Sequence, residues 1–150
     1  MRGVPMVDVT AKSETPRQAS AHGRVRTTAE VIDAIRDGRL PKGDVLTTAQ
    51  VAGVMAAKRT PDLLPLCHPI ALGGVDVSFD LGADDITITG TVRAVDRTGV
   101  EMEALTVVAV AALTVIDMVK GMEPAASVEH VAVTAKSGGK TGDWARPPGR

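Results

Sequence analysis

The fold of this chain is decided by one stretch, Gly99-Val-Glu-Met-Glu-Ala-Leu-Thr-Val-Val-Ala-Val-Ala-Ala-Leu-Thr-Val-Ile-Asp-Met-Val-Lys120. Fourteen of the eighteen residues from Met102 to Val119 are apolar, a run too long for one strand and suited to a helix of about five turns. Apolar residues occupy all sides of that helix, so we expect most of its surface to be buried. Only thirteen residues lie between Glu103 and Asp117, whereas a membrane span needs roughly 20 apolar residues. The pattern therefore predicts a core helix.

Charged side chains stand only at the two ends of this helix. Glu101 and Glu103 lie at its start, where the helix dipole favours acids, and ordinary capping is one interpretation, with Gly121 as the stop. Asp117 fits capping poorly, because an acid near the C-terminal end opposes the dipole, and it lies one turn from Lys120. The two ends are about 21 Å apart along a straight helix. One small ligand therefore cannot touch Glu103 and Asp117 of the same copy.

Composition limits the class of protein. For 150 residues, one domain spanning residues 1–150 is the default, and 44% hydrophobic residues suffice for a core. Aromatic residues make up only 1% and the net charge is −1, which disfavours base-stacking platforms and polyanion binders, so we expect no nucleic-acid partner. The single cysteine excludes an intrachain disulfide framework. No signal peptide or membrane-spanning run is visible, so we expect a cytoplasmic protein with no membrane partner.

Two helices are expected before the middle of the chain. A first strand at residues 19–26 is followed by a helix that the capping box Thr27-Thr-Ala-Glu30 opens and Gly38 ends. Asp44 can cap a second helix that runs to about residue 59. The residues expected on its buried side are Val51, Val54 and Met55.

The remaining strands complete an α+β plan. Residues 75–81 and 86–95 alternate in hydropathy around a turn and predict a hairpin, and residues 128–135 alternate as the last strand. With the first two helices in one crossover, the order is the ferredoxin-like β-α-β-β-α-β plan, an antiparallel sheet with helices packed on one face. We expect residues 1–18 to be a partly mobile segment and residues 136–150 to be a Gly/Pro-rich loop and tail.

A proline-rich stretch, Pro61-Asp-Leu-Leu-Pro-Leu-Cys-His-Pro69, predicts a rigid, non-helical loop. It lacks the Cys and His spacing of metal sites, so no metal ligands are predicted. Adjacent Cys67 and His68 would point apart in an extended loop, which disfavours a nucleophilic pair. His68 is then either a packed loop histidine or a substrate contact, and Cys67 a small apolar filler.

Basic residues are spread along the chain. Lys42 precedes the second helix, whose free N–H groups favour an anion, whereas Arg17 alone would be interpreted as a solvated surface charge. The run Gly139-Lys140-Thr141 is similar to the end of a P-loop, but Thr134 stands where that motif needs glycine and no helix follows. We reject a P-loop, although this glycine loop could still fold over a phosphate.

Several motifs can be interpreted together. They are Met6-Val-Asp-Val-Thr-Ala-Lys12 with Glu14 and Arg17, Lys42-Gly-Asp44, Leu66-Cys-His-Pro69, Gly99-Val-Glu-Met-Glu-Ala-Leu105, Asp117-Met-Val-Lys120 and Ala135-Lys-Ser-Gly-Gly-Lys140. This set closely resembles the cyclic pyranopterin monophosphate synthase family, which performs the second step of molybdenum-cofactor biosynthesis. The resemblance covers residues 6–143, with no departure at the functional positions.

The resemblance implies an enzyme of the lyase class with a ferredoxin-like fold. Its substrate would be a 3′,8-cyclised dihydro-GTP, and its products cyclic pyranopterin monophosphate and pyrophosphate. It also implies a homohexamer, a trimer of dimers with sites at dimer interfaces. No protein-held cofactor is implied, and Mg²⁺ could travel with the triphosphate.

The resemblance also implies roles for particular residues. Asp117 and Lys120 match the catalytic acid–lysine pair, and Lys42 matches a second catalytic lysine. The positions that match substrate-binding residues are Leu66, Cys67, His68, Met102 and Glu103. Those that match the rest of the pocket are Arg17 and Lys136, near the triphosphate, and Glu101.

Two other functions fit the same residues. One is a metal-free nucleotide or pterin phosphohydrolase. The other is a non-catalytic, ligand-binding ferredoxin-like oligomer, in which the charges at the helix ends would be structural.

Overall fold

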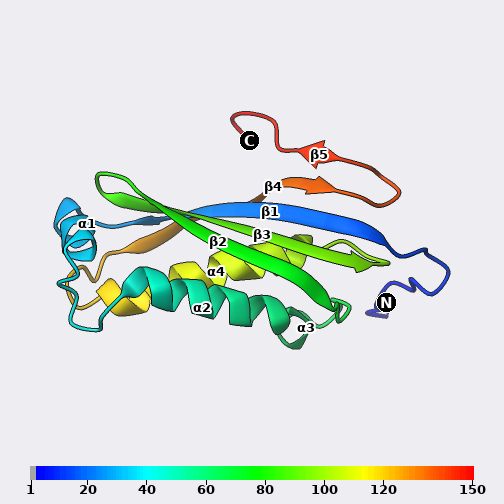
Figure 1. Ribbon diagram of the computed structural model, residues 1–150, viewed down its shortest axis with the longest axis horizontal. Helices are drawn as coiled ribbons and strands as arrows, with labels where there is room; N and C mark the ends of the chain where they lie inside the picture. Colours follow the sequence, from blue (N-terminus) through cyan, green and yellow to red (C-terminus); the bar gives the residue numbers. More distant parts are fainter. Residues whose placement is uncertain (1–2) are drawn as a thin grey trace.

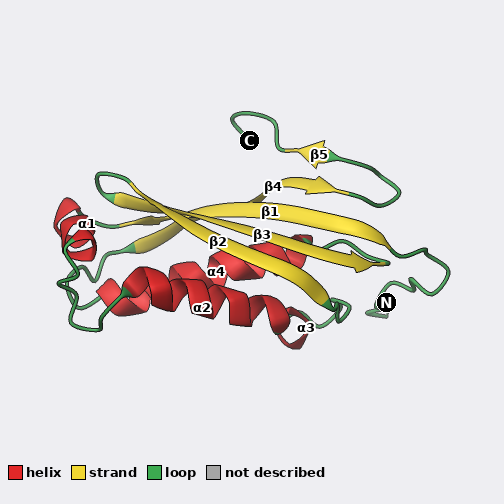
Figure 2. Ribbon diagram, viewed as in Figure 1, coloured by secondary structure: helices red, strands yellow, loops and turns green. Residues whose placement is uncertain are grey.

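An antiparallel sheet with helices on one face forms the body of the molecule (Figures 1 and 2), in a computed structural model that describes residues 3–150. The elements in chain order are β1 (Thr15–Arg26), α1 (Ala29–Arg36), α2 (Val45–Lys58), α3 (Thr60–Leu63), β2 (Leu72–Leu81), β3 (Asp85–Asp96), α4 (Glu101–Val119), β4 (Ser127–Ser137) and β5 (Trp144–Ala145). The strand order is β2-β3-β1-β4-β5, and every pairing is antiparallel. The predicted α+β, ferredoxin-like fold is confirmed.

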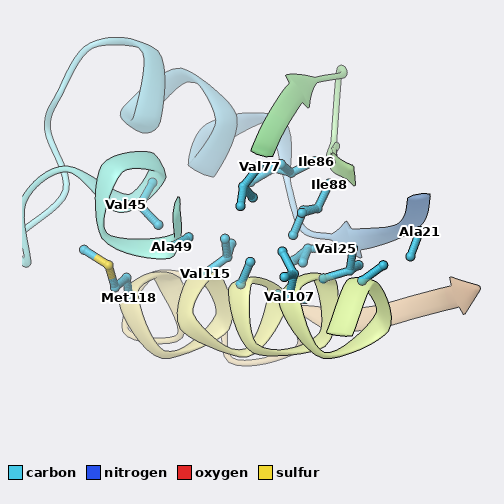
Figure 3. Close-up of a cluster of buried hydrophobic side chains, with 14 of the residues drawn as sticks. Ala21, Val25, Val45, Ala49, Val77, Ile86, Ile88, Val107, Val115 and Met118 are labelled. Carbon is cyan, nitrogen blue, oxygen red and sulfur yellow. The ribbon is translucent and has the colours of Figure 1, made fainter. Parts of the chain in front are cut away.

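Alternation within the strands builds the core. On β1, Ala19, Ala21, Gly23 and Val25 are buried while the residues that alternate with them are not, so every second residue faces the helices. Ile86 and Ile88 of β3 do the same, and Figure 3 shows these side chains meeting those of α2 and α4. The core is aliphatic, as the composition predicts.

Helix α4 packs along the middle of the sheet. By length and composition it is the one helix of residues 3–150 that could cross a membrane, but 56% of its apolar window is buried inside the protein, as expected for a core helix. The helix approaches β1 and β3 closely at two glycines. A Cβ atom at Gly23 would lie 2.8 Å from Val108 Cγ1, and one at Gly90 would lie 2.8 Å from Val107 Cγ1.

The predicted helix starts are confirmed at α2 and shifted by one residue at α1. Asp44 caps α2 by accepting a hydrogen bond from the backbone N–H of Thr47. At α1 the cap is Thr28, whose hydroxyl accepts from the N–H of Val31, and not Thr27, the first residue of the predicted capping box. Gly38 follows α1 with φ +65°, a left-handed conformation that suits glycine and ends the helix as predicted.

The expected buried face of α2 is wrong for two of its three residues, whereas Val54 does pack against the core. Val51 and Met55 are 53% and 52% exposed, and the residues buried instead include Ala49 and Gly53. Small residues face inward because α2 lies close against α4, where a Cβ atom at Gly53 would approach Val107 Cγ1 to 3.2 Å. The larger side chains of Val51 and Met55 therefore point outward.

Three segment predictions also differ from the structure. The first strand begins at Thr15 and not at residue 19, because Pro16 and the residues after it continue the pairing with β3. The proline-rich stretch is not entirely non-helical: it includes α3, with Pro61 in the first turn, where its missing N–H costs no hydrogen bond. The expected C-terminal loop contains the end of β4 and the short strand β5.

Candidate active site

Functional candidates gather at the two ends of α4. Figure 1 shows that the Asp117 end of the helix lies toward α1, whereas its Glu101 end lies toward α3 and the N-terminal segment. We call these groups the lysine cluster (Lys42, Asp117 and Lys120) and the carboxylate cleft (Lys12, Leu66, Cys67, His68, Glu101 and Met102, with the buried Glu103 beside Cys67).

The lysine cluster is centred on one carboxylate. Lys120 Nζ lies 2.7 Å from Asp117 Oδ1, one helical turn away, and Lys42 Nζ lies 3.1 Å from Asp117 Oδ2. Lys42 also donates to the backbone oxygen of Asp117 at 3.0 Å. These contacts bring the three predicted catalytic residues together. Asp117 and Lys120 come from the end of α4, and Lys42 comes from the loop before α2.

Electrostatics keep the Asp117 carboxyl ionised. Hydrogen bonds from Lys120 and then Lys42, together with their positive charges, lower the pKa of Asp117 below its usual value. All three side chains are exposed. The cluster therefore presents two ammonium groups, held in place by one carboxylate, to any anion that arrives from solvent.

Glu103 is a buried acid that adjoins the carboxylate cleft through Cys67, which lines it. Its side chain is 1% exposed, its Oε1 atom lies 3.6 Å from Cys67 Sγ, and its Oε2 atom has no hydrogen-bond partner among the described residues. Burial raises the pKa of Glu103. Burial and the neighbouring Glu103 carboxyl raise the pKa of the Cys67 thiol to about 11, so this cysteine stays protonated at neutral pH.

The cleft is large enough for a nucleotide-sized ligand. It has a volume of about 660 Å³, and Leu66, Cys67 and His68 line one side of it. The start of α4 supplies Glu101 and Met102, and the N-terminal segment supplies Lys12. Polar groups thus converge in a largely apolar hollow.

Two basic residues of the sheet contact the start of α4 or the segment just before it. Lys136 of β4 lies 3.3 Å from Glu101 Oε1, and both also line a second hollow of about 480 Å³ beside Trp144. Arg17 donates to the backbone oxygen of Arg97 at 3.2 Å and lies so close to Gly139 that any side chain there would collide with its guanidinium. The predicted binding residues are therefore gathered around the start of α4.

The structure does not bring the two groups of residues together within one copy. Glu103 and Asp117 stand at opposite ends of α4, about 21 Å apart at the rise of an α-helix.

Two residues outside the predicted site also contribute. Lys12, which belongs to one of the family motifs but has no predicted role, lines the cleft. Arg97, which carries no signal in the sequence, bonds the backbone of Lys12.

The described residues contain no cluster of side chains suited to bind a metal ion. Within residues 3–150, no three side chains of the His, Cys, Asp and Glu types lie close enough to hold a metal ion together. His22 and His130 pair with their ring centroids 4.7 Å apart, but they lie on β1 and β4, away from His68 of the cleft.

The fold and these two clusters define a ferredoxin-like α+β protein whose site combines ammonium groups, carboxylates and a Cys–His loop. Residues 6–139 match the MoaC family, so the chain belongs to this family. The resemblance predicted from the motifs is thereby confirmed.

Several curated relatives carry the same name. The chain is 59% identical over 141 residues to "Cyclic pyranopterin monophosphate synthase 2" of Mycobacterium tuberculosis, covering 94% of this chain and 84% of that protein. It is 57% identical to "Cyclic pyranopterin monophosphate synthase" of Streptomyces griseus, covering 94% and 80%. A protein of that name from a Nocardioides species is 53% identical over 145 residues, covering 95% and 89%. These alignments span most of each protein.

Proposed function

We propose that this protein is a cyclic pyranopterin monophosphate synthase, a lyase of molybdenum-cofactor biosynthesis. Its substrate is 3′,8-cyclo-7,8-dihydroguanosine 5′-triphosphate, and its products are cyclic pyranopterin monophosphate and pyrophosphate. Membership of the MoaC family and the names of the relatives support this assignment. The structural observation that carries it is Asp117 holding Lys42 and Lys120 side by side in reach of solvent.

A triphosphate substrate needs positive charge. Release of pyrophosphate places negative charge on the leaving oxygens, which ammonium groups stabilise. Lys42 and Lys120 supply two such groups at one end of α4, and Lys136 and Arg17 supply two more at the other. Together they match the charge of the proposed substrate.

Opening and closing the purine-derived ring requires proton transfers. In this proposal Lys42 or Lys120 carries the proton, and Asp117 orients the two ammonium groups. His68 in the cleft and Glu103 beside it bind the ring edge. The buried carboxyl of Glu103 retains an unpartnered oxygen that can bond a ligand.

Two copies are needed for one site, because the clusters stand about 21 Å apart on one helix. The outer face of the helical layer favours such pairing: Leu113 and Met102 of α4 are 61% and 41% exposed, and Val51 and Met55 of α2 are also exposed. On α4, residues 109 and 110 lie midway between Met102 and Asp117. A two-fold axis at that point would place the lysine cluster of one copy beside the cleft of the other.

The wider setting of the enzyme follows from the family resemblance. We propose a homohexamer, a trimer of such dimers, that acts in the cytoplasm, where GTP-derived substrates are made and a single free cysteine needs no oxidising compartment. The proposal includes no metal held by the protein. Any Mg²⁺ that takes part arrives bound to the triphosphate.

The assignment is tested by incubating the purified protein separately with the cyclised nucleotide and with GTP. We expect cyclic pyranopterin monophosphate and pyrophosphate from the first and no turnover of the second. Release of phosphate from GTP would instead identify a phosphohydrolase. Binding of the cyclised nucleotide without turnover would identify a non-catalytic binding protein.

A further inference from the structure

Among the described residues, a single side chain outside the N-terminal segment makes polar contacts with it. Residues 3–14 form one wall of the cleft through Val4, Val7, Val9 and Lys12, yet they belong to no helix or strand. Their own hydrogen bonds are local: Lys12 N–H donates to Val9 O, and Thr10 bonds to Asp8. Nothing in those local bonds holds the wall against the start of α4.

Arg97 supplies that attachment. Its Nε donates to the backbone oxygen of Lys12 at 3.1 Å, and its Nη1 lies 3.7 Å from Glu14 Oε1. Across residues 3–150, these are the hydrogen bond and the ion pair that join residues 3–14 to a side chain elsewhere in the chain. A guanidinium suits this task because its planar fork can bond a carbonyl and a carboxylate together.

The same residue also lies at the junction of the other parts of the cleft. Arg97 follows directly after β3 and precedes Glu101, the first residue of α4, by four positions. Its backbone oxygen accepts from Arg17, which in turn lies against Gly139 of the glycine loop. One residue therefore contacts the N-terminal wall, the base of β1 and, through Arg17, the loop after β4.

We infer that Arg97 is a positioning residue that holds residues 6–14, and with them Lys12, over the carboxylate cleft. The expected effect on substrate binding rests on the proposed function. Arg97 does not itself line the cleft but bonds the backbone of Lys12, which does, so it acts on substrate through Lys12. Loss of Arg97 frees the wall while Glu103 and the lysine cluster remain in place. Substrate binding suffers and the chemical step does not.

The experiment compares Arg97→Ala with Arg93→Ala in the full-length protein. Arg93 is a matched control, because it lies on β3 only four positions before Arg97, is 45% exposed against 46% for Arg97, and pairs with an exposed carboxylate, Asp76. Hydrogen exchange of the peptide covering residues 6–14 is measured alongside KM and kcat for the cyclised nucleotide. Arg97→Lys and Glu14→Gln, which each retain part of the attachment, serve as milder variants.

We expect Arg97→Ala to raise KM about tenfold, with kcat changed less than about threefold, because binding and not chemistry is affected. Exchange in residues 6–14 should accelerate, and Arg93→Ala should change neither quantity. The milder variants should fall between Arg97→Ala and the wild type. Unchanged exchange in residues 6–14, or a fall in kcat at constant KM, would overturn the inference. If the wild type fails to turn over the cyclised nucleotide, the proposed function fails, whereas the exchange comparison still decides whether Arg97 holds the segment.

Discussion

Lys42 and Asp117 are 75 positions apart in the sequence, yet the lysine Nζ lies 3.1 Å from the carboxylate Oδ2. The contact joins the loop before α2 to the last turn of α4, and Lys120 bonds the other oxygen of the same carboxylate. Both ion pairs are exposed, where such pairs add little to stability. Their value is therefore in fixing two ammonium groups next to each other.

Asp117→Asn should separate function from stability. Without the carboxylate, the two lysines repel each other and lose their orientation, so we expect kcat to fall by about 100-fold or more. The thermal midpoint should move by no more than about 2 °C, because the pairs are solvent-exposed. Kinetics and calorimetry on the same preparation measure both quantities.

The control for that variant is Asp33→Asn, since Asp33 forms an exposed i,i+3 pair with Arg36 on α1 in the same way that Asp117 does with Lys120. It should keep full activity. An Asp117→Asn protein with undiminished kcat would remove the lysine cluster from the mechanism.

Glu103 should give the protein a distinctive pH dependence of stability. Its folded pKa is raised above the ordinary value of 4.5 by burial, so the native state binds the proton more readily than the unfolded chain. The ionised carboxylate therefore costs stability above the folded pKa, and this cost disappears as the pH falls through it. We expect Glu103→Gln to gain stability over the wild type at about pH 8 and to lose that advantage near pH 5.

Urea unfolding at several pH values tests this prediction, with Glu30→Gln as a control because Glu30 is exposed on α1. A difference between wild type and Glu103→Gln that stays constant with pH would show that Glu103 titrates normally.

Cys67 should be unreactive despite its place in the cleft. Only the thiolate is alkylated, and a pKa of about 11 leaves very little thiolate at neutral pH. We expect the iodoacetamide rate to keep rising with pH beyond the ordinary thiol range. The Glu103→Gln variant removes the neighbouring charge and should react faster. A rate that reaches its plateau near pH 9 would contradict the assigned environment.

Two glycines should be needed for α4 to lie as close to the sheet as it does. Gly23→Ala and Gly90→Ala each place a methyl group within 2.8 Å of a valine of α4, and overpacking of this kind costs about 1–3 kcal/mol. Gly121→Ala is the control, because a Cβ atom there meets nothing within 4 Å. The free energy of unfolding from urea titration measures the effect, and equal stability for all three variants would show that the contact relaxes at no cost.

The fold was largely predictable because its elements carry strong local signals. The apolar run of α4 and the alternation in β3 depend on near neighbours, and both helix-ending Gly38 and the cap Asp44 act within one turn. The buried face of α2 was not predictable in this way. Its apolar residues occupy several sides, so tertiary packing of small residues against α4 decided which side turned inward.

The site was predictable to a lesser extent. The helical spacing of Asp117 and Lys120 anticipates their ion pair, but nothing in the spacing places Lys42 beside them; only the resemblance did. The pairing of Cys67 with Glu103 also depends on tertiary structure. Arg97 had no signal at all, because a surface arginine after a strand is ordinary until its partners are known.

The central claim is that one active site takes its lysine cluster and its carboxylate cleft from different copies of the chain. It is tested most directly by mixing inactive Lys120→Ala and Glu103→Ala proteins, exchanging subunits and measuring formation of cyclic pyranopterin monophosphate. Random pairing makes half of the dimers mixed, each with one intact site, so we predict recovery to about a quarter of wild-type activity. If mixed oligomers form, as mass spectrometry would show, and no activity returns, the shared site is contradicted.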